Sequence, residues 1–153
     1  MFTGIIDSLA TVEDIKNDKG NLQITFKSSI AKELKVDQSL CHNGACLTVV
    51  KTNEDQYTID AISETIARTN LGDLKIGDLI NVERSMSVNS RFDGHLVQGH
   101  IDEVGICEKI SESDGSWVFE FEHSGKNITV EKGSITVNGI SLTVVESEEK
   151  LFS

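Results

Sequence analysis

The chain consists mostly of short segments in which polar and apolar residues alternate or in which β-branched residues cluster. Residues 21–26 alternate strictly and residues 117–121 more weakly, while 46–50, 57–61 and 79–82 are apolar or β-branched runs bounded by turn residues. A period of two places every second side chain on the same face of a β-strand. The pattern therefore predicts an all-β protein.

Turn-forming residues separate these strands at short intervals. Asn43-Gly44 and Asn138-Gly139 are the strongest turn signals, because Asn and Gly both tolerate positive φ. About six short strands in ~90 residues are typical of a small closed antiparallel barrel, in which every strand edge is paired. Helix is expected in only two short segments, Ser28–Leu34, capped by one of its first two serines, and Ser63–Thr69.

The chain also repeats itself at a fixed offset of 95 residues. Without a gap, residues 1–50 match residues 96–145 at 15 of 50 positions. Gly4-Ile5-Ile6-Asp7 returns as Gly99-His100-Ile101-Asp102, and both copies have a Leu-Thr-Val-Val strand two residues after an Asn-Gly turn. A 95-residue period has the size of a small domain rather than of a solenoid or propeller repeat. We expect a duplicated domain.

The two domains would span residues 1–90 and 91–153, with the polar segment Ser85–Asp93 as the linker. At the same offset Ser153 corresponds to Thr58, so the later part of the first copy has no second version. About a hundred residues support an independent core, whereas ~58 are marginal alone. We expect the second domain to be truncated; the alternative is a natural half-domain that packs on the first.

Composition limits the classes of protein that fit. The 153 residues are 38% hydrophobic and 25% charged, as in soluble globular proteins. No apolar stretch approaches the ~20 residues that span a bilayer, and the chain does not begin like a secretory leader. The net charge of −11 argues against a nucleic-acid surface, which needs clustered Lys and Arg. We expect a cytoplasmic protein that binds neither nucleic acid nor membrane.

Three cysteines, Cys41, Cys46 and Cys107, form an odd set that suits reduced thiols in the cytosol. Cys41 and Cys46 would point to opposite faces of an extended strand, unless the Asn43-Gly44 turn bends the chain between them. A pair with this spacing beside His42 is a poor zinc site, and we expect no metal.

Residues shared by both copies could bind a flat ligand. Gly4 and Gly99 would let backbone approach such a ligand closely. The hydroxyls of Thr48 and Thr143 could recognise the polar edge of a heterocycle. An ordinary interpretation stays open, because Leu-Thr-Val-Val is also a good strand and each glycine could be a bulge.

The copies differ at positions that carry chemistry. Ser141 stands where the first copy has Cys46, and His100 stands where the first copy has Ile5. His95 adds a second imidazole near His100. Histidine exchanges protons near neutral pH, so His100 is either a proton carrier or a structural residue.

Six motifs cover essentially the whole chain. They are Met1-Phe-Thr-Gly-Ile-Ile-Asp7, His42-Asn-Gly-Ala-Cys-Leu-Thr-Val49, Glu64-Thr-Ile-Ala-Arg-Thr-Asn-Leu-Gly72, Val82-Glu-Arg84, Gly94-His-Leu-Val-Gln-Gly-His-Ile-Asp102 and Val137-Asn-Gly-Ile-Ser-Leu-Thr-Val144. In this order and spacing they resemble the riboflavin synthases of the alpha-chain type. One departure is Asp93, where that family commonly has a glycine.

The resemblance implies two tandem, similar six-stranded antiparallel Greek-key barrels, the second incomplete in this chain. It also implies a homotrimer assembled through a C-terminal helix, with lumazine synthase as a candidate further partner. Riboflavin synthases are transferases that convert two molecules of 6,7-dimethyl-8-ribityllumazine into riboflavin and 5-amino-6-ribitylaminouracil by moving a four-carbon unit. They need no cofactor and no metal.

Carried over position by position, the resemblance also implies the site residues. The positions associated with catalysis are Phe2, Ser39, Cys46, His95 and His100. The substrate contacts of the first barrel would be Gly4, Ile5, Ile6, Cys46, Leu47, Thr48, Asp60, Ala61, Ile62, Ser63, Glu64 and Thr65. The contacts of the second barrel would be Gly99, His100, Ile101, Lys132, Ser141, Leu142 and Thr143.

Two other classes of protein compete with this interpretation. A non-catalytic lumazine- or flavin-binding protein of the antenna type is built on the same duplicated barrel, and a purely structural barrel would bind no lumazine. The presence of Cys46, His95 and His100 together favours the enzyme.

Overall fold

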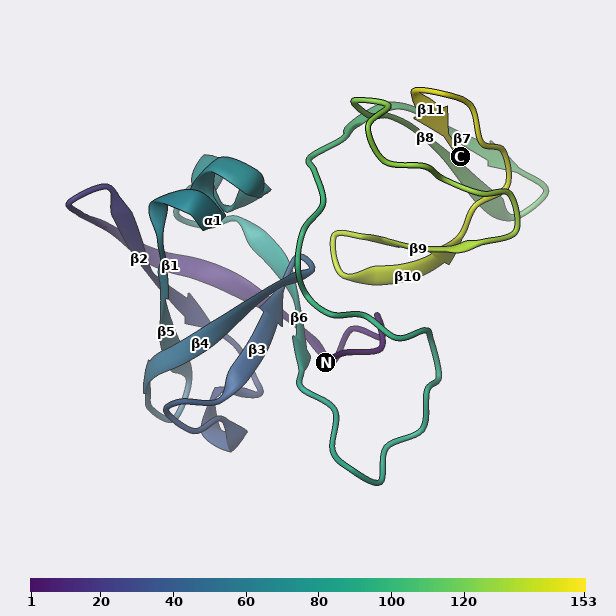
Figure 1. Cartoon of the computed structure of the whole chain (residues 1–153). Helices are drawn as coiled ribbons and strands as arrows, with labels where there is room; N and C mark the ends of the chain where they lie inside the picture. Colours follow the sequence, from purple (N-terminus) through teal and green to yellow (C-terminus); the bar gives the residue numbers. More distant parts are fainter. The chain divides into compact units, whose positions relative to one another are not determined.

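The computed structural model describes residues 1–153, apart from the side chain of Ser113. The chain is mostly β-strand and divides into two compact units (Figure 1). The first unit contains residues 1–101 and 136–141, and the second contains residues 102–135 and 142–153. Among the residues that the structure describes, no helix has the length and apolar character needed to cross a membrane.

Six strands of the first unit close into an antiparallel barrel with the order β1-β2-β5-β4-β3-β6. The strands are β1 (Ser8–Asp18), β2 (Asn21–Lys27), β3 (Ser39–His42), β4 (Ala45–Thr52), β5 (Gln56–Ala61) and β6 (Leu79–Arg84). Helix is limited to α1 (Ser63–Arg68) and to 3₁₀ turns at Ala31–Glu33 and Asn70–Asp73. The β class and the closed six-stranded barrel predicted for the first copy are confirmed.

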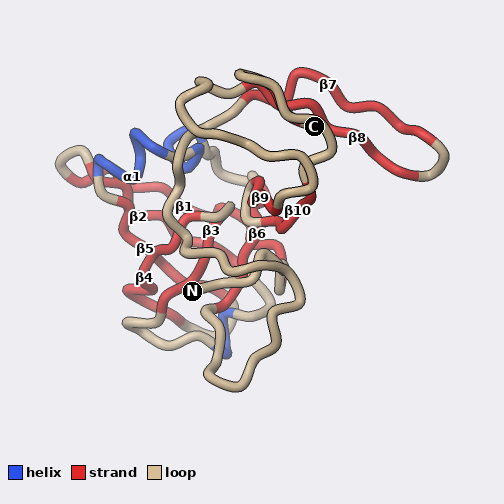
Figure 2. The backbone as a smooth tube through the Cα atoms, turned by 45° about the vertical axis from the view of Figure 1, so that its right-hand side comes forward, coloured by secondary structure: helices blue, strands red, loops and turns tan.

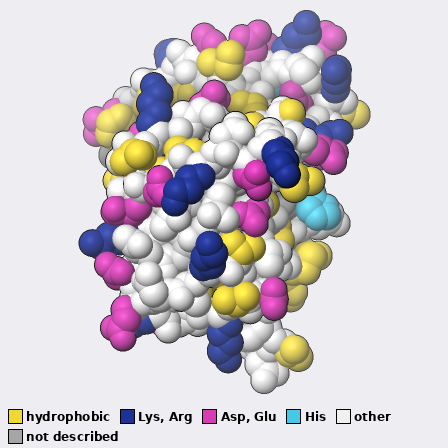
Figure 3. Space-filling model, turned by 90° about the vertical axis from the view of Figure 1, so that its left-hand side faces the viewer, with side chains coloured by type: hydrophobic (Ala, Val, Ile, Leu, Met, Phe, Trp, Pro, Cys, Tyr) yellow, Lys and Arg dark blue, Asp and Glu magenta, His cyan; other side chains and the backbone are white. Residues whose placement is uncertain are grey.

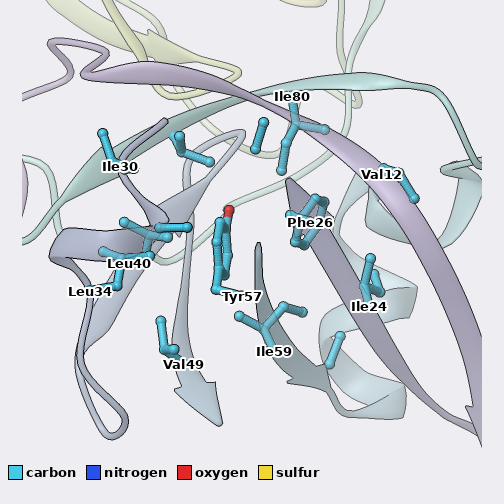
Figure 4. Packing of buried hydrophobic residues seen from close by; sticks show 14 residues of the cluster. Val12, Ile24, Phe26, Ile30, Leu34, Leu40, Val49, Tyr57, Ile59 and Ile80 are labelled. Carbon is cyan, nitrogen blue, oxygen red and sulfur yellow. The ribbon is translucent and has the colours of Figure 1, made fainter. Parts of the chain in front are cut away.

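Alternate side chains of the strands fill the barrel. In β2, Ile24 and Phe26 are fully buried, whereas the intervening Thr25 shares a hydrogen bond of 3.0 Å with the hydroxyl of Thr58. Tyr57 of β5 lies among the apolar side chains of this core and stacks on Phe26, with ring centroids 5.4 Å apart (Figure 4). Each large apolar side chain buried in this way contributes about 1.5–3 kcal/mol. The barrel is therefore a firm support for residues on its outer face.

The predicted helix over residues 28–34 is only one 3₁₀ turn. Leu34 donates its N–H to the carbonyl of Ala31, and the same carbonyl accepts the hydroxyl of Thr52 at 3.0 Å. Ile30, Ala31 and Leu34 are buried in the core. Anchoring to the barrel therefore replaces continuation of the helix.

The second unit is built around a long hairpin of β7 (Ile106–Ser113) and β8 (Ser116–Glu122) (Figure 2). The short strand β11 (Leu151–Phe152) pairs with β8 as a third strand. A separate two-stranded sheet consists of β9 (Ser134–Val137) and β10 (Ile140–Thr143). Within the described residues, the second copy thus forms small sheets and no closed barrel.

The second copy nevertheless repeats the strand register of the first. In both hairpins the register shifts at the same place, after Val12 in the first copy and after Cys107 in the second. The equivalent pairs, each offset by 95 residues, are Thr11–Lys27 and Ile106–Glu122, Val12–Phe26 and Cys107–Phe121, and Phe26–Tyr57 and Phe121–Phe152.

Backbone turns recur at the same offset. The residues with positive φ that share this spacing are Gly4 and Gly99, Lys19 and Asp114, Gly20 and Gly115, Asp37 and Lys132, Asn43 and Asn138, and Gly44 and Gly139. Positive φ is costly for most residues, so its recurrence shows that the backbone path is repeated as well as the sequence.

The surface carries charges of both signs, interspersed over the face shown in Figure 3.

Candidate functional site

The N-terminal segment pairs with the segment just before the second glycine motif. Phe2 and Val97 exchange two backbone hydrogen bonds, of 2.8 and 3.0 Å, in an antiparallel bridge. Both side chains are buried. Phe2 and Val97 are also each other's counterparts at the 95-residue offset. The bridge therefore relates the two glycine motifs by a local two-fold, with Gly4 and Gly99 on opposite sides of it.

Glu83 of β6 fixes the N-terminal segment to the barrel. Its buried carboxylate accepts hydrogen bonds from the N–H of Thr3 (2.6 Å), the hydroxyl of Thr3 (2.7 Å) and the N–H of Gly4 (3.0 Å). Such charge-assisted hydrogen bonds offset the cost of burying the carboxylate. This role of Glu83 is not among those predicted from the sequence, where the available signal is an acidic residue directly after the apolar run of β6.

Beyond the bridge, Gly99 lies against Cys46 of β4. The carbonyl of Gly99 accepts a hydrogen bond of 2.8 Å from the N–H of Cys46. Gly99 has a φ of +86°, and a Cβ atom added to it would lie 2.6 Å from the Cβ of Cys46 and 2.9 Å from the ring of Phe2. Only glycine fits this position.

The same contact occurs on the other side of the bridge, with the copies reversed. The carbonyl of Gly4 accepts a hydrogen bond of 2.8 Å from the N–H of Ser141. Gly4 has a φ of +78°, and an added Cβ atom would lie 2.6 Å from the Cβ of Ser141. Ser141 is the counterpart of Cys46, so the two junctions are equivalent.

The glycine motifs are therefore exchanged between the copies. The family resemblance implies one site with Gly4 and Cys46 and another with Gly99 and Ser141, whereas the backbone hydrogen bonds join Gly99 to Cys46 and Gly4 to Ser141. Each glycine admits the close approach of another strand, because the space a Cβ atom would need is filled by protein atoms. One consequence is chemical: the thiol of Cys46 and the imidazole-bearing segment at His100 belong to the same junction.

His95 is held at both ring nitrogens. Its Nδ1 lies 2.7 Å from the hydroxyl of Ser141, and its Nε2 lies 3.1 Å from the hydroxyl of Thr136. Its backbone N–H donates to the carbonyl of Thr3 at 3.0 Å. His95 is therefore fixed at the Gly4–Ser141 junction, whereas His100, at the other junction, is exposed to solvent.

The remaining predicted residues of the first unit lie on neighbouring barrel strands. Ser39 of β3 is the cross-strand partner of Thr48, and Leu40 that of Leu47. Asp60 accepts a hydrogen bond of 2.9 Å from the side chain of Gln23. The segment that follows leaves β5 and enters α1; its predicted contact residues are Ala61, Ile62, Ser63, Glu64 and Thr65.

Ile101 reaches the β3–β4 turn, where its Cδ1 would lie 3.2 Å from a Cβ atom added to Gly44. Ile5 is exposed, and Ile6 is half-buried. Lys132, Leu142 and Thr143 belong to the second unit and are exposed there. The backbone of Lys132 has positive φ, and its N–H donates to the carbonyl of Val144 at 2.8 Å.

A polar hollow of about 630 Å³ lies beside the N-terminal segment of the first unit. The N-terminal segment, the end of β6 and the linker line it, with Ile5, Glu83, Arg84 and Asp93 among the lining residues. Of the predicted site residues, Ile5 alone lines this hollow, and neither Cys46 nor His100 does. The hollow is therefore separate from the Gly99–Cys46 junction.

His42 belongs to the barrel core. Its ring packs against Phe26 and Tyr57, and Nδ1 lies 3.1 Å from the carbonyl of Leu40. Complete burial lowers the pKa of His42 to about 4, so the ring is neutral at neutral pH. Among the described residues, no group of three or more His, Cys, Asp or Glu side chains is placed to hold a metal ion.

The amino-acid sequence of this chain is similar to those of known proteins. Residues 3–85 and 98–153 match the family model for the lumazine binding domain. The chain is 38% identical to riboflavin synthase of Actinobacillus pleuropneumoniae, over 99% of this chain and 72% of the relative. It is 39% identical to riboflavin synthase of Bacillus subtilis (94% and 68% covered) and 39% identical to that of Mycobacterium tuberculosis (94% and 74% covered).

Solved structures share the fold at lower identity. The lumazine-bound structure of LumP superposes with a TM-score of 0.87 at 22% identity, covering 99% of this chain and 84% of LumP. The riboflavin-bound structure of LumP gives a TM-score of 0.89 at the same identity and coverage.

Proposed function

The chain belongs to the riboflavin synthase family, and we propose that it converts two molecules of 6,7-dimethyl-8-ribityllumazine into riboflavin and 5-amino-6-ribitylaminouracil. The observation that carries the proposal is the hydrogen bond between Gly99 and Cys46, which joins the imidazole-bearing motif of one copy to the thiol strand of the other.

We assign the first lumazine site to the Gly99–Cys46 junction. It combines Cys46, Leu47 and Thr48 of β4 with Gly99, His100 and Ile101, and the segment 60–65 extends it along the barrel. Cys46 is partly exposed and His100 is exposed, which leaves both side chains accessible to a ligand. The equivalent Gly4–Ser141 junction, with His95, is proposed as the second lumazine site.

The reaction requires only a small catalytic contribution from each individual side chain. One lumazine loses a proton from its C7 methyl group, and the resulting carbanion attacks the second lumazine, so a four-carbon unit passes from one ring to the other. Holding the rings face to face can contribute roughly 7–11 kcal/mol through proximity. Proton transfer by His100 or Cys46 would add ~100- to 10,000-fold each.

We further propose that the repeat contains two lumazine-binding barrels, at residues 1–90 and 91–153, the second incomplete in this chain. The shared strand registers and the shared positive-φ positions support this, because both copies follow the same backbone path. The exchanged glycine motifs do not alter the boundaries in the sequence; they mean that each copy supplies one strand end to the other.

Association between chains follows from the position of the junctions. Gly4 and Gly99 lie on opposite sides of the Phe2–Val97 bridge, whereas the reaction needs two stacked rings. We therefore propose that a Gly99–Cys46 junction of one chain faces a Gly4–Ser141 junction of another, as in a homotrimer.

The direct test is to incubate the purified chain with 6,7-dimethyl-8-ribityllumazine and follow riboflavin fluorescence, expecting one riboflavin per two lumazines consumed. Cys46→Ser and His100→Gln should each lower turnover by about 100-fold or more. Cys107→Ser, which removes the exposed cysteine of the second unit, should leave turnover unchanged. Lumazine binding without riboflavin formation would identify an antenna-type binding protein instead.

Mixing inactive chains tests the pairing of junctions. A Cys46→Ser chain mixed with a Ser141→Ala chain should regain activity, because one interface in the mixed oligomer keeps both intact junctions. Cys46→Ser mixed with His100→Gln should not, since both changes lie at the same junction. Recovery in both mixtures would refute the exchanged assignment, because it would place Cys46 and His100 at different sites.

A further inference from the structure

Cys41 and Cys46 lie directly opposite each other on β3 and β4. The two strands are joined by Asn43-Gly44, and both of these residues have positive φ, as a tight two-residue hairpin requires. His42 and Ala45 flank the turn, and Cys41–Cys46 is the next pair along the hairpin. Cross-strand partners project from the same face of an antiparallel sheet. The turn therefore places the two thiols on the same face, whereas in one continuous strand they would point to opposite faces.

The backbone groups of the two cysteines do not form hydrogen bonds with each other. The N–H of Cys46 donates to Gly99, away from β3, as expected for a pair that follows the closing pair of a two-residue hairpin. Such non-hydrogen-bonded pairs have Cα atoms about 4.5 Å apart. Disulfides span Cα separations of about 4.4–6.8 Å. A disulfide can therefore form here with the strands in place, at the short and strained end of the range.

The two side chains share one environment. Cys41 is buried in a small cluster with Phe2 and Val97, and Cys46 packs against the same cluster while remaining partly exposed. The second copy shows the same convergence, because Thr136 and Ser141, the counterparts of Cys41 and Cys46, both reach the ring of His95. Side chains at these two positions thus point into one small space in both copies.

We propose that Cys41 and Cys46 form a reversible redox pair, in which Cys41 resolves the oxidised form of Cys46. Hydrogen peroxide oxidises Cys46 first: a sulfur–oxygen bond forms, the peroxide bond breaks and water leaves, giving the sulfenic acid. The sulfur of Cys41 then attacks the sulfur of Cys46. The sulfur–sulfur bond forms, the sulfur–oxygen bond breaks, and the departing hydroxide takes the Cys41 proton and leaves as water.

The order of the steps follows from exposure. Cys46 is the thiol that solvent can reach, whereas Cys41 is 2% exposed. Burial, reinforced by the nearby carboxylate of Glu83, raises the pKa of Cys41 to about 12, so Cys41 is a poor first target for an oxidant. Strained disulfides are more easily reduced than relaxed ones, which suits a transient bond in a reducing compartment.

The consequence for catalysis rests on the proposed function. Formation of the disulfide removes the Cys46 thiol from the lumazine site and stops turnover. It also prevents further oxidation of Cys46 to the sulfinic acid, which thiol reductants do not reverse. Cys41 would then act as a positioning and protecting residue, without contact to the substrate.

Peptide mapping of the intact chain after peroxide treatment tests the pair. Wild type and Cys107→Ser should lose the mass of two hydrogens and give a Cys41–Cys46 cross-linked peptide, which dithiothreitol removes. Cys41→Ser should instead gain oxygen at Cys46, in a form that dithiothreitol does not reverse. If serine is poorly tolerated at the buried position, Cys41→Ala replaces it. Absence of the cross-linked peptide in folded wild type, or a cross-link to Cys107, would overturn the proposal.

Riboflavin formation provides a separate readout. Oxidised wild type should regain most of its turnover with dithiothreitol, whereas treated Cys41→Ser should stay about tenfold or more below its untreated level. Equal recovery in both chains would refute the protective role of Cys41. The remaining outcome is a wild type that forms the cross-link after peroxide treatment and yet, in its reduced state, never converts lumazine. In that case the proposed function fails while the redox pair stands.

Discussion

Gly44 and Gly139 pack against each other at the tips of their two hairpins. A Cβ atom on Gly44 would lie 3.2 Å from the backbone nitrogen of Gly139, and one on Gly139 would lie 2.9 Å from that of Gly44. The two glycines are counterparts at the 95-residue offset, like Phe2 and Val97. Asn81 of β6 joins the hairpins further, since its side chain donates to the carbonyl of Asn138 at 2.9 Å. The equivalent turns of the two copies thus meet at a second point of the local two-fold.

Replacing Gly99 should test the close contact at the thiol junction. Gly99→Ala adds a methyl group 2.6 Å from the Cβ of Cys46 and at positive φ, whereas Gly77→Ala meets nothing within 4 Å at a similar φ of +95°. We expect Gly77→Ala to cost about 1–2 kcal/mol in unfolding free energy from the backbone alone, and Gly99→Ala to cost about 1–3 kcal/mol more. Urea denaturation of both variants measures the difference. Equal losses of unfolding free energy would show that the junction rearranges to accommodate the added methyl group.

Glu83→Gln should loosen the N-terminal segment. The amide keeps the shape of the carboxylate but presents a donor group where Glu83 accepts three hydrogen bonds. The loss of charge and the mismatch should destabilise the segment by about 1–3 kcal/mol. The hydrogen-exchange rates of the Thr3 and Gly4 amides should rise strongly. As a control, Thr3→Val removes the two hydrogen bonds of the hydroxyl, to Glu83 and from the N–H of Ile5, but leaves the N–H bonds of Thr3 and Gly4 to the carboxylate, so it should have a smaller effect on the Gly4 amide.

Protonation of His42 should weaken the barrel in mild acid. The folded-state pKa is lowered from 6.5 to about 4 by burial, so between these values the unfolded chain binds a proton that the folded chain does not. Stability is therefore full above pH 6.5 and falls as pH falls toward 4. The loss between about pH 7.5 and about pH 5 should be about 2 kcal/mol. His42→Leu should abolish this component, whereas His100→Gln, at an exposed position, should retain it; the same slope in His42→Leu as in wild type would disprove the assignment.

The strands were predictable because their sequence patterns are local. The alternation over residues 21–26 became β2, and the apolar run over 79–82 became β6, each extended by one or two residues. The Asn43-Gly44 turn bent the chain between Cys41 and Cys46, the condition under which the sequence allowed the two to share a face. These outcomes depend only on neighbouring residues.

The exchange of glycine motifs could not be predicted in this way. In a repeat, Gly4 meets the same local pattern whether it pairs with Cys46 or with Ser141, so both arrangements satisfy the sequence equally. The choice depends on long-range contacts, namely the Phe2–Val97 bridge and the Glu83 carboxylate. The short helix over 28–34 failed for a related reason, because the Thr52 hydroxyl, distant in sequence, binds the carbonyl of Ala31.

The reciprocal junctions make the linker dispensable for holding the chain together. Arg91 lies exposed in the loop between β6 and the second glycine motif, where trypsin can cut. After such a cut, the N-terminal fragment would still be bound through Phe2 to Val97 and through Cys46 to Gly99, by bonds that do not involve the severed loop. A nicked chain should therefore elute as one species in gel filtration and separate only in denaturant. What the intact loop supplies is effective concentration: it keeps two mutually dependent fragments within reach of each other while they fold.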